Sequence, residues 1–481
     1  MSELPAGWAT FSIADIGGLA GGKTPSKANP AFWSSRDIPW ISPKDMKKLY
    51  LEDSEDRISK VALSDAGMAL HPAKSILMVT RSGILQHTFP VALARVDSTV
   101  NQDIKVIAPH SEIDTIFLLY SLRAFGQIIL QRCSKAGTTV QSIDSDKLEA
   151  FPFPLPPLAE QKRIAQKLDA LLAQVDTLKA RIDAIPALLK RFRESALSAA
   201  VSGRLTQSRE KSRPPAEPRR LNDRAQPASA EEISQAIEVT GEPFPDQWTV
   251  YALEQIVDGE RGIPYGIVQT GDPVVEGVST VRCGDVRHLR IDTTALKIVA
   301  RDIEKNYART RLKGGEVLLA IRGSVGNTAV APKSLANCNI SREVAMIPCI
   351  DDVDSTFVAL VLQSKRGQQL LAGKTRGVAQ KGINLADVRR LLIALPSRSA
   401  QSEIVRRVEQ LFAYADQLEA KVAAAKQRID ALTQSLLAKA FRGELVPQDP
   451  TDEPASVLLE RIRTQRAATP KPKRGRKAAT S

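Results

Sequence analysis

The chain has 481 residues, with 67 Lys and Arg against 54 Asp and Glu and a formal net charge of +13. This length exceeds one hydrophobic core and predicts two or more domains. The charge favours a polyanion such as nucleic acid, although a basic surface that is merely solvated would give the same total. The four cysteines form no C-x-x-C pair and no apolar run reaches 18 residues, which argues against a zinc site and a membrane-spanning helix. Few cysteines and no apolar leader segment predict a cytoplasmic protein.

The sequence repeats itself at an offset of 240 residues, and this repeat predicts the architecture. The repeated unit is a globular domain followed by a long helix, and small slips in the offset indicate loop insertions. Matching pairs include Leu4 and Phe244, Trp8 and Trp248, Ile41 and Val281, Asp45 and Asp285, Ile104 and Val344, Pro156 and Pro396, Gln161 and Gln401, and Gly203 and Gly443.

The two globular domains, at 1–150 and 244–391, are each predicted to mix α and β structure. Short β-rich runs lie between Gly, Pro and polar turn signals, and a helical stretch follows them in each domain. The β-rich runs are 76–80, 91–96, 104–107, 317–321 and 344–347, and the helical stretches are 114–133 and 354–372.

Long helices are expected at 151–205 and 392–446, where apolar residues alternate steps of four and three, the spacing of a coiled-coil seam. We expect the two helices to pair antiparallel within one chain. Packing of each helix onto its own domain and homodimerisation through the same seam are the alternatives. Pro186 predicts a kink in the first helix. The seam residues are Ile164, Leu168, Leu171, Val175, Leu178 and Ile182 in the first helix, and Leu411, Leu418, Val422, Ile429 and Leu432 in the second.

Two segments outside these elements have the composition of flexible chain. Residues 206–243 are rich in Pro, Ser, Arg and Glu, which predicts a linker. Residues 447–481 form a carboxyl-terminal segment whose last part is strongly basic, and this tail is expected to be disordered.

An antiparallel helix pair would relate the two domains by a pseudo-twofold axis, and the backbone of duplex DNA has the same symmetry. The layout therefore predicts a reader of two unlike DNA half-sites, with the base pairs between them read only through shape. Arg and Gln can contact base edges, whereas Lys more often binds phosphate. The candidate DNA-binding residues are Lys23, Thr24, Ser26, Lys27, Lys44, Arg81, Gln102, Lys135, Thr138 and Gln141 in the first domain, and Arg261, Tyr265, Arg282, Arg287, Arg322, Arg342, Lys374, Arg376, Gln380 and Lys381 in the second.

Residues 17–24, GGLAGGKT, match the G-x-x-x-x-G-K-[ST] pattern of phosphate-binding loops. Such a loop must open a helix, but Pro25 follows directly and the other repeat lacks the Lys-Thr pair, so a nucleotide-binding enzyme is disfavoured. No metalloprotease, EF-hand or nucleophile-elbow motif occurs, and the adenine-methyltransferase motif Asn-Pro-Pro-aromatic is also missing. The sequence predicts a chain with no catalytic residues, no metal site and no cofactor of its own. A basic coiled-coil adaptor for proteins is the remaining alternative.

The starts and ends of the helices resemble one known family, the specificity subunits of type I restriction-modification systems. Leu155-Pro156-Pro157-Leu158-Ala159-Glu160-Gln161 is similar to the start of the family's first conserved helix. Gly443-Glu444-Leu445-Val446-Pro447-Gln448-Asp449-Pro450 is similar to its carboxyl end. The second helix begins Leu395-Pro396-Ser397-Arg398-Ser399-Ala400-Gln401, without the Glu-Gln pair, so its contacts should differ there.

The resemblance implies partners beyond double-stranded DNA. Two methyltransferase subunits would dock on the paired helices and use S-adenosylmethionine to methylate adenine at N6. Restriction subunits that require ATP and Mg would cleave unmodified DNA. The resemblance carries over no base-contacting residue, because the recognition domains of the family vary greatly.

Overall fold

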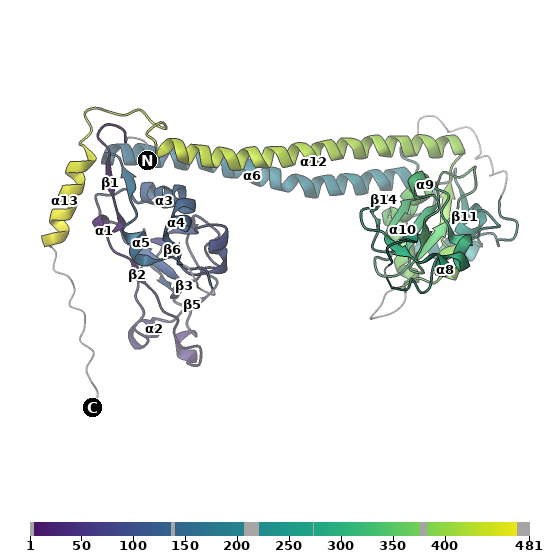
Figure 1. Cartoon of the computed structure of the whole chain (residues 1–481), viewed down its shortest axis with the longest axis horizontal. Coiled ribbons are helices and arrows are strands. Elements are labelled where there is room, and N and C mark those ends of the chain that lie inside the picture. The colour runs from purple at the N-terminus through teal and green to yellow at the C-terminus, as the bar shows by residue number, and fades with distance from the viewer. Residues whose placement is uncertain (1–3, 136–139, 206–220, 273, 376–381, 469–481) are drawn as a thin grey trace. The chain divides into compact units, whose positions relative to one another are not determined.

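Figure 1 shows a computed structural model of the chain, which describes residues 4–135, 140–205, 221–272, 274–375 and 382–468. The chain divides into two compact units, 1–182 with 424–481 and 183–423. Each unit therefore contains one mixed α/β domain and one part of each long helix. The long helices are α6 (Leu158–Val201) and α12 (Arg398–Ala440). The predicted fold class, two similar mixed domains with two long helices that pair, is confirmed.

The first domain is built around a five-stranded sheet in the order β2-β9-β6-β7-β4, with a smaller sheet β5-β3-β8 beside it. The central strands are short aliphatic runs that are buried along their whole length. The strands are β2 (Ala20–Gly21), β3 (Ile38–Ile41), β4 (Tyr50–Leu51), β5 (Arg57–Ile58), β6 (Ile76–Val79), β7 (Val91–Ala94), β8 (Thr99–Val100) and β9 (Ile104–Ile107), and β1 (Ala9–Phe11) pairs with β10 (Phe153–Leu155). The helices are α1 (Ile13–Ile16), η1 (Pro30–Phe32), α2 (Lys60–Asp65), η2 (Gly83–Gln86), α3 (Thr115–Ala124), α4 (Gly126–Cys133) and α5 (Ser145–Glu149).

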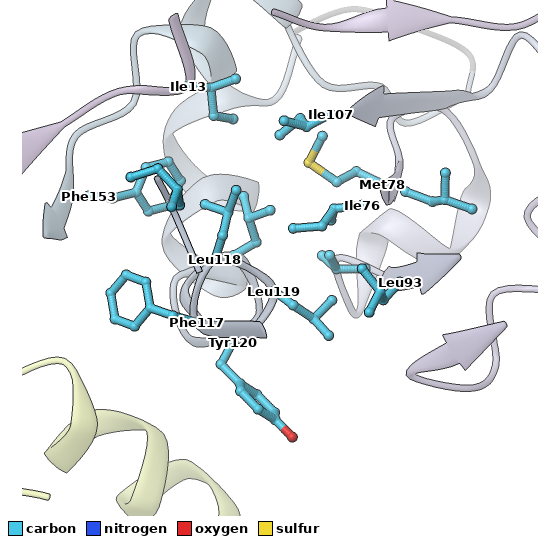
Figure 2. Packing of buried hydrophobic residues seen from close by; sticks show 14 of the residues in the cluster. Ile13, Ile76, Met78, Leu93, Ile107, Phe117, Leu118, Leu119, Tyr120 and Phe153 are labelled. Carbon is cyan, nitrogen blue, oxygen red and sulfur yellow. The ribbon is translucent and has the colours of Figure 1, made fainter. Parts of the chain in front are cut away.

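Helix α3 forms the middle of the first core. It begins after Asp114, whose carboxylate accepts a hydrogen bond from the backbone N–H of Phe117 at 2.8 Å and so caps the helix. In Figure 2, Leu118 and Leu119 of this helix lie toward Ile76 on β6, whereas Phe117 lies farther from that strand, and all four side chains are fully buried. An aliphatic helix face packed on an aliphatic sheet removes both from water and holds the domain together.

The second domain repeats the central strand pairings of the first, in the three-stranded sheets β17-β16-β19 and β15-β12-β18. The parallel pairs Trp40 with Thr99 and Ile41 with Val100 recur as Thr280 with Asn339 and Val281 with Ile340, an offset of 240 residues. Its strands are β11 (Thr249–Ala252), β12 (Val278–Val281), β13 (Val286–Arg287), β14 (Arg290–Ile291), β15 (Lys297–Val299), β16 (Val317–Ala320), β17 (Thr328–Val330), β18 (Asn339–Ile340), β19 (Val344–Ile347) and β20 (Leu392–Leu395). Its helices are η3 (Leu253–Ile256), α8 (Arg301–Glu304), η4 (Lys305–Thr310), η5 (Lys333–Leu335), α9 (Ser355–Gln363), α10 (Lys365–Lys374) and α11 (Leu385–Arg389).

The last turn of each long helix completes the core of the domain that belongs to the other repeat. The first core includes Leu437 and Ala440 of α12 and Phe441, which directly follows the helix. The Phe441 ring lies 5.4 Å from that of Phe117. The equivalent last turn of α6, residues 197–201, is part of the second core. The first turns of each helix pack onto its own domain. The alternative that each helix packs onto its own domain therefore holds for its first turns, while its last turn packs onto the domain of the other repeat.

Ion pairs within each unit show that α6 and α12 run antiparallel, as predicted. In the first unit Lys179 binds Asp430 at 2.9 Å, and in the second Arg193 binds Asp416 at 2.6 Å and Glu419 at 2.9 Å. The partner on α12 moves back from Asp430 to Asp416 as the residue on α6 advances from Lys179 to Arg193. Helix α6 continues without interruption through Pro186.

The predicted seam is buried mainly where the helices also touch a domain. Ile164, Leu168 and Val175 are buried, whereas Leu178 and Leu432 are 48% and 45% exposed. Two helices alone can cover only one stripe of each other, so the middle of the pair keeps apolar side chains at the surface. The remaining predicted seam residues, Leu171, Ile182, Leu411, Leu418, Val422 and Ile429, are half-buried.

Both predicted flexible segments contain a helix. Helix α7 (Ala230–Thr240) lies in the predicted linker, and Ala236 packs against Ala252 and Leu392 of the second domain. Helix α13 (Ala455–Ala468) lies in the carboxyl-terminal segment and adds Leu458, Leu459 and Ile462 to the first core. Composition hid both helices because each buries only a narrow apolar stripe. Residues 206–220 and the basic tail at 469–481 lie outside the described residues.

Replacing Phe441 with Ala should destabilise the first domain by about 3–5 kcal/mol, because it removes a buried ring from that core. Amide hydrogen exchange should show faster opening of β6 and β9, while β16 and β19 keep their protection. Val201→Ala is the matched control and should act on β16 and β19 instead. Equal effects of either variant on both domains would contradict the arrangement in which the last turn of each long helix completes the core of the other repeat's domain.

Helix α7 should be held by charge in a pH-dependent way. Hydrogen bonds from Arg390, with one Nε–Oε1 distance of 2.8 Å, lower the pKa of Glu232 from 4.5 to about 2. A lowered folded-state pKa stabilises the fold above the unfolded value and loses that effect as pH falls. Glu232→Gln should therefore cost stability above pH 4.5, and the difference from wild type should shrink as the pH falls toward about 2. Chemical denaturation across this range measures it, and a difference that stays constant would refute the assignment.

Candidate nucleic-acid interface

Three loops of the first domain converge beyond the end of β6. The Arg81 backbone N–H donates to the Asp103 carbonyl at 3.3 Å, and Arg81 forms a bridge with Ser142. The Ser142 carbonyl in turn accepts from the N–H of Lys135 at 2.9 Å. The backbone thus brings together four of the predicted residues, Arg81, Gln102, Lys135 and Gln141, from distant parts of the sequence.

We call this meeting of three loops the junction. The second domain builds the same junction from equivalent positions. Arg322 forms a bridge with Gly382, and the preceding residue, Ile321, donates its N–H to the Glu343 carbonyl at 2.9 Å. Arg322 therefore takes the place of Arg81, and Arg342 takes the place of Gln102. Both arginines are exposed. Thr138 in the first domain and Arg376, Gln380 and Lys381 in the second lie outside the described residues.

A carboxylate occupies the equivalent position at each junction, Asp103 in the first domain and Glu343 in the second. Asp103 lies 3.4 Å from the Nε of Arg81, whose side chain remains 61% exposed. Glu343 instead accepts a hydrogen bond from the Cys283 thiol at 3.1 Å. Burial, together with this hydrogen bond, raises the pKa of the Cys283 thiol and keeps it protonated. The two carboxylates were absent from the sequence-based candidates, because anions were not expected at a DNA surface, but the repeat aligns them.

The segment from Lys23 to Lys27 is held through its backbone. The Lys23 N–H donates to the Val100 carbonyl at 3.1 Å, and the indole N–H of Trp40 donates to the Lys23 carbonyl at 2.9 Å. The indole N–H of Trp33 reaches the Ser26 carbonyl at 3.2 Å. The side chains of Lys23, Thr24, Ser26 and Lys27 stay exposed, and Thr24 donates to Gln102 at 2.6 Å.

Glycines allow two segments of the chain to pass close to each other at the start of this segment and at the equivalent place in the second domain. A Cβ on Gly22 would lie 1.9 Å from the Val100 carbonyl oxygen, and one on Gly266 would lie 1.8 Å from the Ile340 carbonyl oxygen. The GGLAGGKT segment therefore contains strand β2 and a tight crossing. The next helical element is η1, with three residues, so the helix that a phosphate-binding loop requires does not follow.

Three predicted cations are engaged within the protein. Arg261 is paired at 2.8 Å with Glu316, which is 2% exposed, so the arginine is needed to compensate a buried charge. Lys44 binds Glu55 at 3.1 Å and Asp56 at 2.8 Å. Arg282 binds Asp285 and the Ala295 carbonyl. Their role as DNA-binding residues stays a prediction, and Arg261 is the most engaged of the three, since its guanidinium also donates to the Arg311 carbonyl.

The other candidates of the second domain lie at the surface. Tyr265 is 48% exposed and pairs with Ala345 in an isolated bridge. Arg287 is exposed on β13, opposite Arg290 of β14. Lys374 is exposed at the end of α10. These positions leave their side chains accessible to a ligand.

The start of each long helix is locked to its domain by one buried glutamine. Gln161 accepts from the Asp114 N–H at 3.0 Å and donates to the Pro156 carbonyl at 3.0 Å. Gln401 repeats both bonds with Asp354, at 2.8 Å, and Pro396, at 3.0 Å. The missing glutamate does change the contacts, because the buried Glu160 accepts the indole N–H of Trp8 at 3.0 Å and Ala400 cannot. Burial raises the pKa of Glu160.

A second anchor joins the first domain to α6 without a counterpart at the second. The hydroxyls of Tyr50 and Tyr120 both donate to Asp169, from Tyr120 at 2.7 Å. Burial and this carboxylate raise the pKa of Tyr50 to about 12. Sequence reasoning missed this contact because Asp169 is an ordinary charged residue on an exposed helix face.

Comparison with known proteins gives a consistent result. Residues 5–187 and 267–425 match the family model described as the type I restriction modification DNA specificity domain. The chain is 37% identical to the specificity subunit of the EcoBI type I restriction enzyme of Escherichia coli, over 73% of this chain and 72% of that one. It is 33% identical to the EcoKI specificity subunit of Escherichia coli K12, over 71% of this chain and 70% of that one.

Solved structures show the same fold. The HsdS subunit from Thermoanaerobacter tengcongensis aligns with a TM-score of 0.55 at 18% identity, over 92% of this chain and 98% of that one. A chain from a structure of a type I R-M system, solved to explain complex assembly and conformational transition, aligns with a TM-score of 0.62 at 17% identity. That alignment covers 92% of this chain and all of the other.

Proposed function

This chain belongs to the family of type I restriction-modification DNA specificity subunits, and we propose that it reads one DNA site in two parts, one with each domain. The family's role is DNA recognition. The observation that carries the two-part reading is the repeated junction, with Arg81 in the first domain and Arg322 in the second. Each exposed guanidinium can offer two parallel N–H donors to a guanine edge.

The two half-sites should differ in sequence, because the junctions differ around the shared arginine. Gln102 and Asp103 in the first domain correspond to Arg342 and Glu343 in the second. An amide favours adenine, and a second guanidinium favours guanine or phosphate. We therefore propose an asymmetric, bipartite site.

The helix pair is proposed to set the spacing of the half-sites and to bind the partner subunits. A helix of 44 residues is about 66 Å long at 1.5 Å per residue, and an antiparallel partner would stiffen it. Exposed apolar side chains lie along both helices, at Leu178, Leu188 and Phe192 on α6 and at Tyr414 and Leu432 on α12. Exposed apolar side chains on both helices support docking of two methyltransferase subunits by further helix packing.

In this proposal the chain contributes recognition, and its partners contribute chemistry. The methyltransferase subunits would supply S-adenosylmethionine-dependent methylation of adenine, and restriction subunits would supply cleavage driven by ATP with Mg. Among the described residues, no cluster of three or more His, Cys, Asp or Glu could hold a metal ion, and no helix is apolar and long enough to span a membrane. We place this activity in the cytoplasm, with the DNA.

Arg81→Ala and Arg322→Ala should each weaken DNA binding by about 1–3 kcal/mol, with base preference relaxed in one half-site only. The measurement is affinity for duplexes changed one base pair at a time, repeated at several salt concentrations. Arg95→Ala is the control, because Arg95 lies over the Tyr50 ring and binds Glu52. Loss of preference in both halves from one variant would contradict the two-part reading.

Deletion of the gene in its host should remove one bipartite N6-methyladenine motif from the methylome. Reintroduction of the wild-type gene should restore the motif. An unchanged motif, in a host without a second system that writes it, would rule out the proposed function. A coiled-coil adaptor would also leave DNA affinity nearly independent of salt, whereas a DNA reader loses affinity steeply as salt rises.

A further inference from the structure

Two cavities occupy equivalent places in the two units, and the first borders the recognition junction through Ser82, which donates its N–H to the Gln141 carbonyl at 3.1 Å. Each has a volume of about 580 Å³. The first lies where α3 and α4 meet, close to the end of α12. The second lies where α9 and α10 meet, close to the end of α6. The repeat relates their linings, with Lys48 and His288, Arg123 and Gln363, and Gln434 and Glu194 in matching positions.

The first cavity combines cations with an apolar floor. Lys47, Lys48 and Arg123 line it and have no ion-pair partner among the described residues, and none of the described residues that line it is a carboxylate. We call the apolar part of its lining the floor, which includes the buried Phe89. Ile84, also in the lining, is 42% exposed. An anionic group with an apolar neighbour would satisfy both features.

The second cavity has a weaker positive charge, and Leu197 is the one apolar residue among the described residues that line it. Lys190 and Lys365 line it without an ion-pair partner among the described residues, while Arg193 is held by Asp416 and Glu419. Glu194 adds a negative charge where the first cavity has Gln434. The two cavities should therefore bind the same ligand with different strengths.

A protein segment fits these cavities better than a DNA backbone does. Phosphate contacts require cations and hydrogen-bond donors at an accessible surface, and they gain nothing from a concave apolar floor. Protein interfaces characteristically bury an apolar anchor in a pocket and surround it with a polar rim. The repetition of the cavity in both units indicates that one kind of segment binds twice.

We propose that each cavity receives the same segment, an apolar residue flanked by carboxylates, from one of two identical partner subunits. The first cavity binds it more tightly because it has more unpaired cations. This inference rests on the proposed function, which supplies a partner present in two copies. It adds a contact on the domains to the docking surface on the helices.

The test uses the full chain and the methyltransferase subunit of the same host, with native mass spectrometry as the readout. Lys47→Glu combined with Lys48→Glu should lower the affinity of the tighter site about tenfold or more. At a concentration where the wild type carries two partner copies, the variant should carry one. Lys60→Glu combined with Lys74→Glu, outside the cavity on the same domain, should leave two copies bound.

A second pair of variants tests the apolar floor without changing charge. Ile84→Ser should weaken partner binding about threefold or more, since it removes exposed apolar area from the edge of the cavity. Ile128→Ser is the matched control, because Ile128 is 37% exposed on α4 and does not line the cavity. Circular dichroism verifies that all four variants are folded.

Two copies bound to both Lys47→Glu/Lys48→Glu and Ile84→Ser would overturn the inference and leave the proposed function intact. Weaker DNA binding with unchanged partner stoichiometry would assign the cavity to DNA phosphate and would overturn it as well. A wild-type chain that binds no methyltransferase subunit and shows no base preference would overturn both proposals together.

Discussion

The structure depends on the exchange of helix ends between the two repeats. Each domain leaves its core open where Phe117 or Phe357 lies, and the last turn of the helix that follows the other domain fills that space. Because apolar burial provides most of the folding free energy, neither repeat can fold fully from its own residues. The antiparallel direction of α6 and α12 follows, since each helix must begin at one domain and end at the other.

Charge is distributed differently in the interior contacts and at the surface loops. Arg261 neutralises the buried carboxylate of Glu316, and Arg390 pairs with the half-buried Glu232. Arg322 and Arg342 protrude from loops that are fixed only through their backbone. A net positive charge therefore says little about where DNA binds until the internally paired cations are set aside. The exposed cations on loops that backbone hydrogen bonds hold in place are then the candidates for binding a ligand.

The architecture could be predicted from the sequence because the repeat is carried by core residues, which tolerate little change. Gln161 and Gln401 make equivalent hydrogen bonds, and Trp8 and Trp248 each pack on the core of their own domain, so their alignment indicated both domains and both helices. The surface could not be predicted equally well. Arg261 looked like a loop cation, and only its distance to Glu316 shows its role. Helix α7 was hidden by a composition typical of linkers, because one buried alanine and an ion pair suffice to dock it.

The close crossings at Gly22 and Gly266 separate two kinds of evolutionary change. Any side chain at either glycine would collide with a neighbouring carbonyl, so these positions are closed to substitution. The side chains of Lys23, Thr24 and Lys27 are exposed, and hydrogen bonds to the carbonyls of Lys23 and Ser26 hold the path of the segment. Replacement of Lys23, Thr24 or Lys27 would therefore change the exposed surface of the domain while the scaffold underneath stays the same.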